Sequence, residues 1–317
     1  MTGSLLLLHS MSTHRPFIGI ALLILSTWAL SSLDAGGKWL MQFGLPLVVL
    51  SWVRYLIHAI LVLIFTLPNR GLSIFKSKQM KFQIVRGTVV LTATLTFFTA
   101  LSYLPQAEAT SINFLAPLLV LCLAPFVLKE PSRLYRWLAA FCGFAGVLII
   151  VRPGSGLHPL GVMFGLMTAG IFSLQFLVTR KLAEDDSMTT LLWTGLVGTA
   201  ISTVLVFFYL DDVARILVEY EWVDWLILAS TGVFGTLGHW LQIKAYQNAP
   251  ASLLAPFVYL QIVAATSIAW VIWKQFPDAL SWLGIAIVIG SGVIASMIEW
   301  RHNQSTKRLL QQALHEA

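Results

Sequence analysis

The chain has 317 residues, of which 57% are hydrophobic and 11% are charged, and its mean hydropathy is +0.81. A soluble domain carries about 25% charged residues and hides its apolar side chains in one core. This composition excludes a soluble enzyme, a secreted disulfide-bonded domain and a disordered chain. It predicts an all-α polytopic membrane protein.

The first segment, residues 1–16, contains a run of four leucines. That run is shorter than the apolar core of a secretory signal, which has about 7–15 residues. We interpret the segment as a cytoplasmic tail. The sequence leaves open whether translation starts at Met1 or at Met11.

A helix needs about 20 apolar residues to cross the hydrocarbon core of a bilayer. The chain contains ten such stretches, separated by short connections rich in proline, glycine or charge. The predicted spans are residues 17–37, 46–67, 83–104, 108–128, 134–151, 159–180, 190–210, 224–244, 252–273 and 280–300. A basic cytoplasmic tail follows at 301–317, for which we expect a short helix on the membrane surface.

Positive charges predict the orientation of these spans. With the N-terminus in the cytoplasm, fifteen Lys and Arg residues fall on that side, and four fall on the other: Lys38, Arg152, Arg215 and Lys274. Loops rich in Lys and Arg stay cytoplasmic, so both termini are predicted to be cytoplasmic. The net charge of +6 then reflects topology and anionic membrane lipid, and no nucleic-acid partner is expected.

An internal repeat divides the chain into two halves, residues 17–151 and 159–300. A shift of 145 residues aligns Leu115 with Leu260 and Trp137-Leu138 with Trp282-Leu283, and a shift of 142 aligns Ser31 with Ser173. Each half has five spans, and an odd number inserts the second half upside down. The sequence therefore predicts two inverted five-helix repeats, which are typical of alternating-access transporters.

Polar side chains at membrane depth are costly, so each is a candidate for a functional site. Arg54 lies in the second span, and His58 follows one turn later on the same face. A guanidinium beside a titratable imidazole favours binding of a carboxylate-bearing solute. Alternatively, Arg54 pairs with Asp34 or with backbone carbonyls and only holds helices together. Asp34 is a candidate for proton coupling, or a solvated residue at the end of the first span.

The fourth span contains Asn113 and Pro117. A proline cannot donate to the carbonyl four residues earlier, which here belongs to Asn113. We expect Asn113 to bind substrate and Pro117 to act as a hinge. The alternative is a kink without a functional role.

Three further side chains are predicted to bind substrate: Gln175, Tyr259 and Gln261. Gln175 has the alternative of a hydrogen bond between helices. His239, which shares a helix face with Gln242, is a second candidate for proton coupling. We assign Glu108 to a turn and exclude it from the site. Two glycine stripes predict close helix packing: Gly161 with Gly165, and Gly232, Gly235 and Gly238.

Enzyme signatures are absent from the sequence, which contains no HExxH, GxSxG, phosphate-binding glycine loop or CxxC. Cys122 and Cys142 both lie in apolar runs, and we expect them to pack rather than to form a disulfide or bind a metal. The sequence therefore predicts neither an enzyme nor a cofactor.

Several segments resemble the drug/metabolite transporter superfamily of EamA type over nearly the whole chain. The resemblance lies in SWVRYLIHAILVL, ALSYLPQAEATSINFLAPLLVL, LKEPSRLYRWLAAFCGFAGVLIIVRP and APFVYLQIVAATSIAWVIWKQFPDALSWLGIAIVIGSG. APFVYLQ and FPD are similar to a branch with S-adenosylmethionine and other organic-metabolite carriers. The resemblance implies ten helices and carriage of small organic solutes. The chain departs from it at Gln275, and at Gln261 and Ile262, where many members have Glu-Pro.

We therefore expect a secondary transporter of a small zwitterionic or anionic metabolite in the bacterial cytoplasmic (inner) membrane, with S-adenosylmethionine as one candidate. An amino-acid or drug efflux carrier is the alternative within this class. A membrane scaffold or lipid-handling protein is the alternative from another class. The sequence leaves open the coupling ion or proton, and whether the protein is a monomer or a homodimer.

Overall fold

The computed structural model describes residues 16–128, 134–152, 156–182, 184–249, 254 and 257–316. Helices account for nearly all of these residues and no strand occurs among them, which confirms the predicted all-α class. The predicted tail over residues 1–15 and the connection at residues 129–133 lie outside the described residues.

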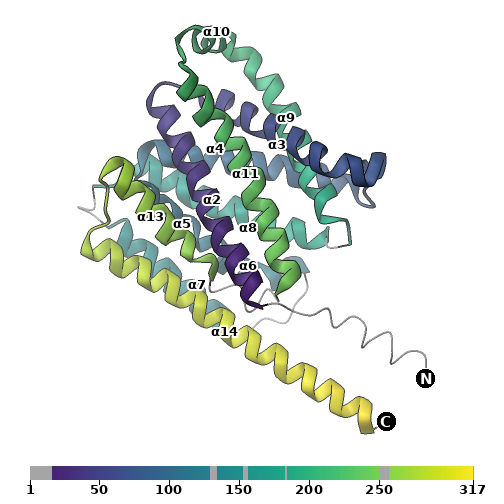
Figure 1. The fold of residues 1–317 in the computed structure, drawn as a ribbon. Helices are drawn as coiled ribbons and strands as arrows, with labels where there is room; N and C mark the ends of the chain where they lie inside the picture. The colour runs from purple at the N-terminus through teal and green to yellow at the C-terminus, as the bar shows by residue number, and fades with distance from the viewer. Residues whose placement is uncertain are drawn as a thin grey trace.

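Each of the ten predicted spans coincides with a helix or a pair of helices (Figure 1). Among the described residues, seven helices are long and apolar enough to cross a membrane, two apolar helices are shorter, and the fourth span is divided in two. The helices are α2 (Pro16–Gln42), α3 (Leu47–Arg70), α4 (Met80–Tyr103), α5 (Gln106–Asn113), α6 (Leu115–Leu128), α7 (Leu134–Ile150), α8 (Pro159–Lys181), α9 (Ser187–Val206), α10 (Leu210–Glu219), α11 (Trp222–Asn248), α13 (Leu260–Trp273) and α14 (Ala279–Glu316).

Three features differ from the sequence prediction. Helix α2 continues to Gln42, so Lys38 belongs to a helix and not to a loop. The connection between α9 and α11 forms the amphipathic helix α10, which the acidic residues of that segment concealed. The expected short surface helix after residue 300 is wrong, because α14 runs to Glu316 without a break.

The most extensive helix contacts join the first half of the chain to the second. They are α2 with α11, α4 with α8, α3 with α9, and α7 with α14. In the predicted repeat, α2 of the first half corresponds to α8 of the second, and α4 corresponds to α11. The pair α2–α11 therefore has α4–α8 as its counterpart. The pairs α3–α9 and α7–α14 each join two helices that occupy the same position in the two halves. The two-fold relation between the halves stays a prediction, and it would produce this contact pattern.

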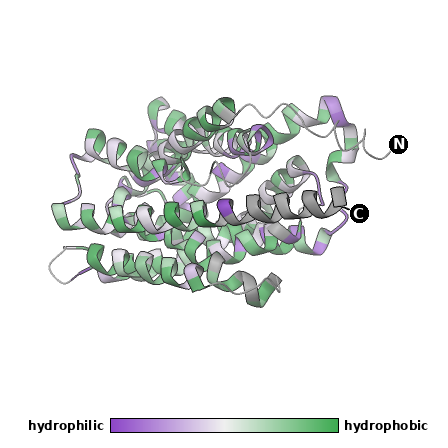
Figure 2. Cartoon of the chain, turned by 90° about the horizontal axis from the view of Figure 1, so that it is seen from below, coloured by the Kyte–Doolittle hydropathy of each residue, from purple (hydrophilic) through white to green (hydrophobic). Residues whose placement is uncertain are grey.

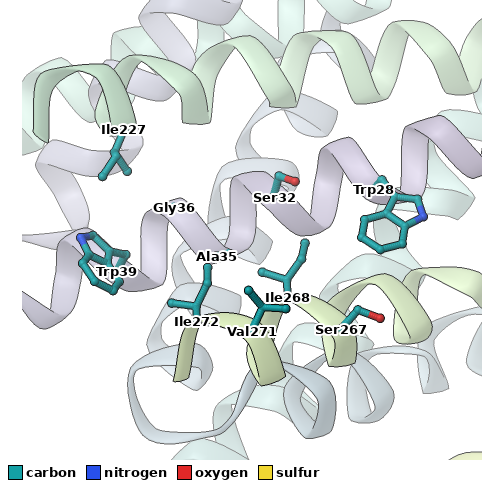
Figure 3. Close-up of a pocket in the computed structure, with 10 residues that line it drawn as sticks. All are labelled: Trp28, Ser32, Ala35, Gly36, Trp39, Ile227, Ser267, Ile268, Val271 and Ile272. Atoms are coloured by element: carbon teal, nitrogen blue, oxygen red, sulfur yellow. The ribbon is translucent and has the colours of Figure 1, made fainter. Parts of the chain in front are cut away.

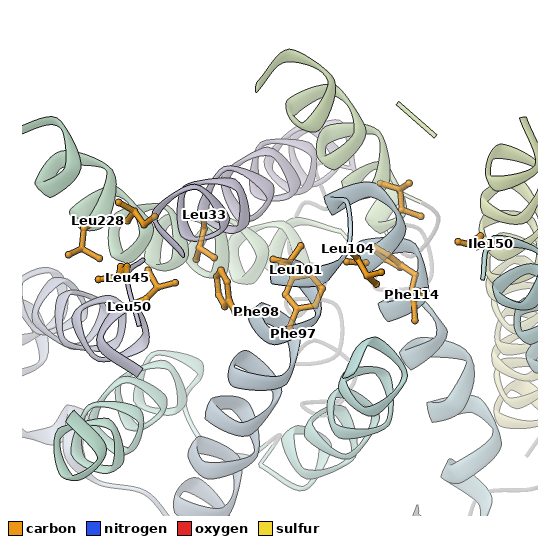
Figure 4. Packing of buried hydrophobic residues seen from close by; sticks show 14 of the residues in the cluster. Leu33, Leu45, Leu50, Phe97, Phe98, Leu101, Leu104, Phe114, Ile150 and Leu228 are labelled. Atoms are coloured by element: carbon orange, nitrogen blue, oxygen red, sulfur yellow. The ribbon is translucent and has the colours of Figure 1, made fainter. Parts of the chain in front are cut away.

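The main hydrophobic cluster joins α2, α3, α4 and α11 and includes Leu33, Leu50 and Phe98 (Figure 4). Gly37 admits the Phe98 ring, since a Cβ at Gly37 would lie 2.3 Å from its Cε1. Most residues along the helices are hydrophobic (Figure 2), and many large hydrophobic side chains are exposed, as a lipid environment requires.

The predicted glycine packing is confirmed. A Cβ at Gly232 would meet Ile57 at 2.6 Å, and one at Gly235 or Gly238 would meet a leucine of α2 at 2.8 Å. Gly161 likewise faces Leu104 at 2.7 Å. These glycines let α11 lie against α2 and α3, and let α8 lie against the end of α4.

Polar junctions tie the two halves together at both ends of the bundle. At one end, which we call the Arg70 end, Arg70 lies 2.5 Å from Asp186. Beside them Asp185 accepts hydrogen bonds from the Ser77 hydroxyl, the Lys78 amide and the Gln83 amide group. At the opposite end, the Arg152 end, Arg152 lies 2.6 Å from Asp278.

The crossing of α7 and α14 generates a first prediction. A Cβ at Gly284 would lie 2.6 Å from the Gly146 carbonyl oxygen. This oxygen belongs to the backbone of α7, which cannot move aside as a flexible side chain can. We expect Gly284→Ala to destabilise the protein by about 1–3 kcal/mol through overpacking. Gly290→Ala on the same helix is the matched control, because nothing lies within 4 Å of its new Cβ. Thermal unfolding in detergent measures both, and equal midpoints would contradict the close crossing.

The Asp185 junction generates a second prediction. Desolvation raises the pKa of Asp185, but the hydrogen bonds from Ser77, Lys78 and Gln83 outweigh it and lower the pKa below its ordinary value. The ionised carboxylate therefore stabilises the fold above its ordinary pKa, and this stabilisation is lost as the pH falls through the lowered value.

We expect Asp185→Asn to lower the unfolding midpoint at neutral pH. The difference from the parent should begin to shrink as the pH falls below about 4 and vanish below the lowered pKa of Asp185. Glu184→Gln, one residue earlier and exposed, is the control and should match the parent at every pH. A difference between Asp185→Asn and the parent that persists in acid would show that charge is not its cause.

Candidate functional site

One face of α2 carries a buried row of polar side chains, which we call the α2 polar stripe. Its members are spaced four, three and four residues apart, so they share a helix face, and they are Thr27, Ser31, Asp34 and Lys38. Their exposed fractions are 2%, 0%, 7% and 3%. The stripe therefore faces the interior of the bundle. The alternative of a solvated Asp34 is wrong.

The middle of the stripe contacts the fourth and ninth spans. The Ser31 carbonyl accepts a 2.8 Å hydrogen bond from the Gln106 side chain on α5. The Ser31 hydroxyl donates to the carbonyl of Gln261 on α13 at 3.3 Å. Gln261 thus joins the stripe through its backbone, and Gln106 is a polar neighbour that sequence reasoning missed.

The Arg152 end of the stripe holds a second missed group. Lys38 donates to the Leu104 carbonyl at 2.6 Å and lies 5.2 Å from the centroid of the Trp273 ring. It also acts electrostatically on Glu108, which is 6% exposed and has one carboxylate oxygen without a partner. Glu108 belongs to α5, so its assignment to a turn was wrong. The small, apolar residues beside Glu108 in the sequence were the signal that could have predicted its burial.

The fourth span is interrupted between α5 and α6, and the hinge role of Pro117 stays a prediction. Helix α5 ends at Asn113 and α6 begins at Leu115, so the interruption falls at Phe114, three residues before Pro117. Tyr259, which is 145 residues later, interrupts the ninth span before α13. The rings of Phe114 and Tyr259 pack against each other with 4.9 Å between their centroids. The two breaks thus meet in the interior.

The second break has Ile262 at the place where the first has Pro117, and Pro256 lies three residues before Tyr259. The Ile262 amide donates to the Tyr259 carbonyl at 3.0 Å, a bond over three residues instead of four. The Tyr259 side chain is 5% exposed, and its hydroxyl occupies the space that a Cβ on Gly292 would take. Packing against α14 and Phe114 therefore holds the Tyr259 side chain at this break.

Two predicted amide residues have open acceptors. The side-chain oxygens of Asn113 and Gln175 are buried and have no hydrogen-bond partner in the structure. Asn113 lies next to the Phe114–Tyr259 contact. The backbone carbonyl of Gln175 accepts a hydrogen bond from the Thr179 hydroxyl on the same helix.

A small enclosed space, which we call the Arg54 chamber, brings three predicted residues together. Its polar lining consists of Arg54, Tyr55 and His58 from α3, Thr194 from α9 and His239 from α11. The imidazole rings of His58 and His239 lie edge to face, with 6.3 Å between centroids. The chamber has a volume of about 10 Å³, room for about one water molecule.

Hydrogen bonds fix the His58 ring. Its Nε2 lies 3.2 Å from the Leu191 carbonyl, and its Nδ1 lies 3.1 Å from the Thr236 hydroxyl, which is also 2.8 Å from the Gly232 carbonyl. A neutral ring accepts from Thr236. A protonated ring donates to it, and the hydroxyl proton then turns to Gly232. Both protonation states of His58 therefore find partners.

Arg54 donates to the Thr94 hydroxyl at 3.4 Å and lies 4.9 Å from the centroid of the Tyr55 ring. Asp34 acts on it electrostatically, but no ion pair within 4.0 Å joins the two among the described residues, so the predicted direct pair does not form. The alternative of a bond from Arg54 to backbone carbonyls is likewise not seen in its recorded hydrogen bonds.

Arg86 is a second arginine at this site, and the charge count had assigned it to a cytoplasmic loop. It lies on α4, donates to the Thr179 hydroxyl at 2.8 Å, and also donates to the Thr194 hydroxyl that lines the chamber. The sequence analysis missed Arg86 as a site residue because it lies at the start of the third span, where a basic residue is typical of the end of a loop.

A cavity much larger than the Arg54 chamber lies elsewhere. It has a volume of about 740 Å³ and lies between α2, α11 and α13, with Trp28 and Trp39 at its two ends (Figure 3). Its remaining lining is mostly aliphatic, and none of the predicted site residues contributes to it. Nor does any group of three or more metal-ligating side chains occur in the part of the chain that the structure describes.

The helix count, the apolar surface and the buried polar stripe define a polytopic membrane protein with a polar interior. The sequence profile of the EamA-like transporter family matches residues 17–152 and again residues 159–297. The chain therefore belongs to the EamA-like transporter family. It is a transporter and not an enzyme.

Relatives are similar over most of the chain. A riboflavin transporter of Vibrio cholerae is 24% identical over 93% of this chain and 97% of its own length. An S-adenosylmethionine uptake transporter of Rickettsia bellii is 26% identical over 86% of this chain and 91% of its own. A solved crystal structure with 20% identity aligns with a TM-score of 0.61 over 89% of this chain and 97% of that chain, which supports the fold alone.

The contact between the stripe and Glu108 generates a third prediction. We expect Lys38→Met to destabilise the protein by about 1–3 kcal/mol, because it leaves the Leu104 carbonyl and Glu108 buried without their partner. Adding Glu108→Gln should recover part of this loss, as a double-mutant cycle would measure. Lys76→Met, at an exposed lysine, is the control. Strictly additive effects would contradict the interaction of Lys38 with Glu108.

Proposed function

We propose that this transporter moves a small organic metabolite across the bacterial cytoplasmic membrane by alternating access. The observation that carries the proposal is the α2 polar stripe, four buried polar side chains on one face of a membrane-spanning helix. The two halves, residues 17–151 and 159–300, would be inverted repeats that move against each other. Both termini would be cytoplasmic, which follows from the distribution of Lys and Arg.

The stripe would line the solute pathway. Polar groups at membrane depth that face neither lipid nor water need a reason to be kept, and a pathway is such a reason. The stripe joins two groups of polar residues. Ser31 bonds with Gln106 and Gln261, and Asp34, one turn after Ser31 on α2, acts electrostatically on Arg54 of α3. It thereby connects the helix breaks with the Arg54 chamber.

The solute would be zwitterionic or anionic. Arg54 and His58 would bind its carboxylate, while the amides of Asn113, Gln175 and Gln261 and the hydroxyl of Tyr259 would bind its polar atoms. The open acceptors of Asn113 and Gln175 support this assignment. S-adenosylmethionine, which is zwitterionic, is one candidate, and a relative is named for its uptake.

The breaks at Phe114 and Tyr259 would supply the movement. A broken helix bends at low cost because its backbone hydrogen bonds are already interrupted, and Pro117 keeps the first break from closing. Asp34 and His239 would couple the cycle to a proton, with exchange of solutes as the alternative. Ten spans are enough for a monomer to enclose the pathway, and a homodimer is equally compatible.

Amino-acid or drug efflux is the alternative within this class. A lipid-handling protein would need a polar opening toward the bilayer, and the lining of the cavity between α2, α11 and α13 is mostly aliphatic.

Uptake of labelled S-adenosylmethionine and riboflavin into proteoliposomes tests the proposal. If either is transported, we expect Arg54→Ala to lower the rate about tenfold or more, since losing a hydrogen bond from a charged donor costs about 1.5–3 kcal/mol. Arg215→Gln, at an exposed arginine that bonds Asp212 and Gly44, is the control and should transport normally. Parent-like transport by correctly inserted Arg54→Ala would overturn the assignment of the site.

A further inference from the structure

The apolar stretch that contains α9 and α10 is too long for one membrane span. Ser187–Glu219 has 33 residues and would be about 50 Å long as a straight helix, whereas the hydrocarbon core of a bilayer is about 30 Å thick. Helix α9, with 20 residues, is by itself long enough to cross that core. The 3₁₀ helix η2 (Phe207–Tyr209) separates α9 from α10, which lies at one end of the bundle (Figure 1).

One face of α10 packs on the bundle. Ile216 is buried and belongs to the main hydrophobic cluster, against which Val213 also packs. The Arg215 guanidinium donates to the Gly44 carbonyl at 3.2 Å. Gly44 follows the last turn of α2, so α10 is held at the Arg152 end of the bundle.

A second face of α10 is apolar and exposed. It consists of residues at positions i, i+4, i+7 and i+8, which is the spacing of one stripe on an amphipathic helix: Leu210, Ala214, Leu217 and Val218. Val218 is 86% exposed and Leu217 is 64% exposed. Contact of this face with water would cost free energy in proportion to its apolar area, so the face is suited to an apolar medium.

The third face of α10 is charged. Asp211, Arg215 and Glu219 follow one another at intervals of four residues, and all three are exposed. Arg215 also pairs with Asp212 at 2.9 Å, so α10 carries three carboxylates and one guanidinium. A helix with an apolar face beside a charged one lies along the boundary between lipid and water.

Lipid is the apolar medium next to α10. Val204 near the end of α9 and Trp222 at the start of α11 are exposed side chains of membrane-spanning helices, so they contact lipid. Phe207 and Phe208 of η2 are also exposed and continue this apolar surface from α9 to α10. A tryptophan at the end of a span is typical of the bilayer interface.

We propose that α10 is an interfacial helix. Its face of Leu210, Ala214, Leu217 and Val218 is buried in the boundary between lipid headgroups and acyl chains at the Arg152 end, while its charged face stays in water. Helices that bind anionic lipid carry Lys and Arg on the polar face, whereas α10 has an excess of carboxylates. Apolar burial therefore holds it in the bilayer surface, with no requirement for anionic headgroups. This proposal rests on the membrane location of the chain and not on the proposed transport function.

Fluorescence quenching by lipid tests the position of α10. In a background with Cys122 and Cys142 changed to alanine, Val218→Cys is labelled with bimane, and the protein is reconstituted into phosphatidylcholine vesicles. Glu219→Cys, the next residue and on the charged face, is the matched control. We expect phosphatidylcholine with acyl chains brominated near the headgroup to quench the Val218→Cys label severalfold more than the Glu219→Cys label. Chains brominated at their far end should quench the Val218→Cys label less.

Leu217→Cys is a second position on the apolar face and should behave as Val218→Cys does. Equal quenching of the apolar and charged positions would overturn the proposal, because it would place both faces in the same medium. Stronger quenching by bromine at the far end of the chains would also overturn it, because α10 would then lie deep in the bilayer.

Two further measurements separate the bilayer surface from other partners. Iodide in the water should quench the Glu219→Cys label and spare the Val218→Cys label. Replacing part of the phosphatidylcholine with phosphatidylglycerol should leave the quenching by lipid unchanged, and a strong increase would contradict binding without anionic headgroups. If a second copy of the chain covered the face instead, lipid would quench the Val218→Cys label weakly and more strongly as the protein is diluted in lipid. That result would contradict the proposal.

Discussion

Hydrocarbon offers no hydrogen-bond partner, and this constraint determines where the polar side chains of α2 can lie. Thr27, Ser31, Asp34 and Lys38 share one face, and the fold buries that face almost completely against the bundle interior. The glycines of α11 support the arrangement, because they let α11 lie close enough to α2 and α3 to enclose Asp34 and Arg54. The helix breaks then supply Gln106 and Gln261 to the same face.

The two helix breaks form one structure. Phe114 and Tyr259 occupy equivalent positions of the two halves, and their rings meet in the interior. One break has a proline three residues later, and the other has Ile262 at the same place. Pro117 lowers the cost of the break in the first half, and the packing of Phe114 against Tyr259 joins the two breaks.

The fold was predictable from the sequence because lipid leaves few choices: long apolar stretches must become helices, and the break before Pro117 follows from a missing amide donor. The proximity of Arg54, His58 and His239 was only partly predictable. Helical spacing placed Arg54 and His58 on one face, but the arrival of His239 depends on how α11 packs. Lys38, Arg86 and Glu108 were missed because charges near span ends are typical of loops, and only tertiary packing buries them.

The central claim is that the α2 polar stripe lines a pathway that water and solute can enter. The most direct measurement is labelling by a membrane-impermeant thiol reagent of Ser31→Cys, in a background with Cys122 and Cys142 changed to alanine. Leu25→Cys, on the 56% exposed side of α2, is the lipid-facing control. We predict that Ser31→Cys is labelled and that transported solute slows the labelling. Labelling of Ser31→Cys no faster than Leu25→Cys, with or without solute, would contradict the account.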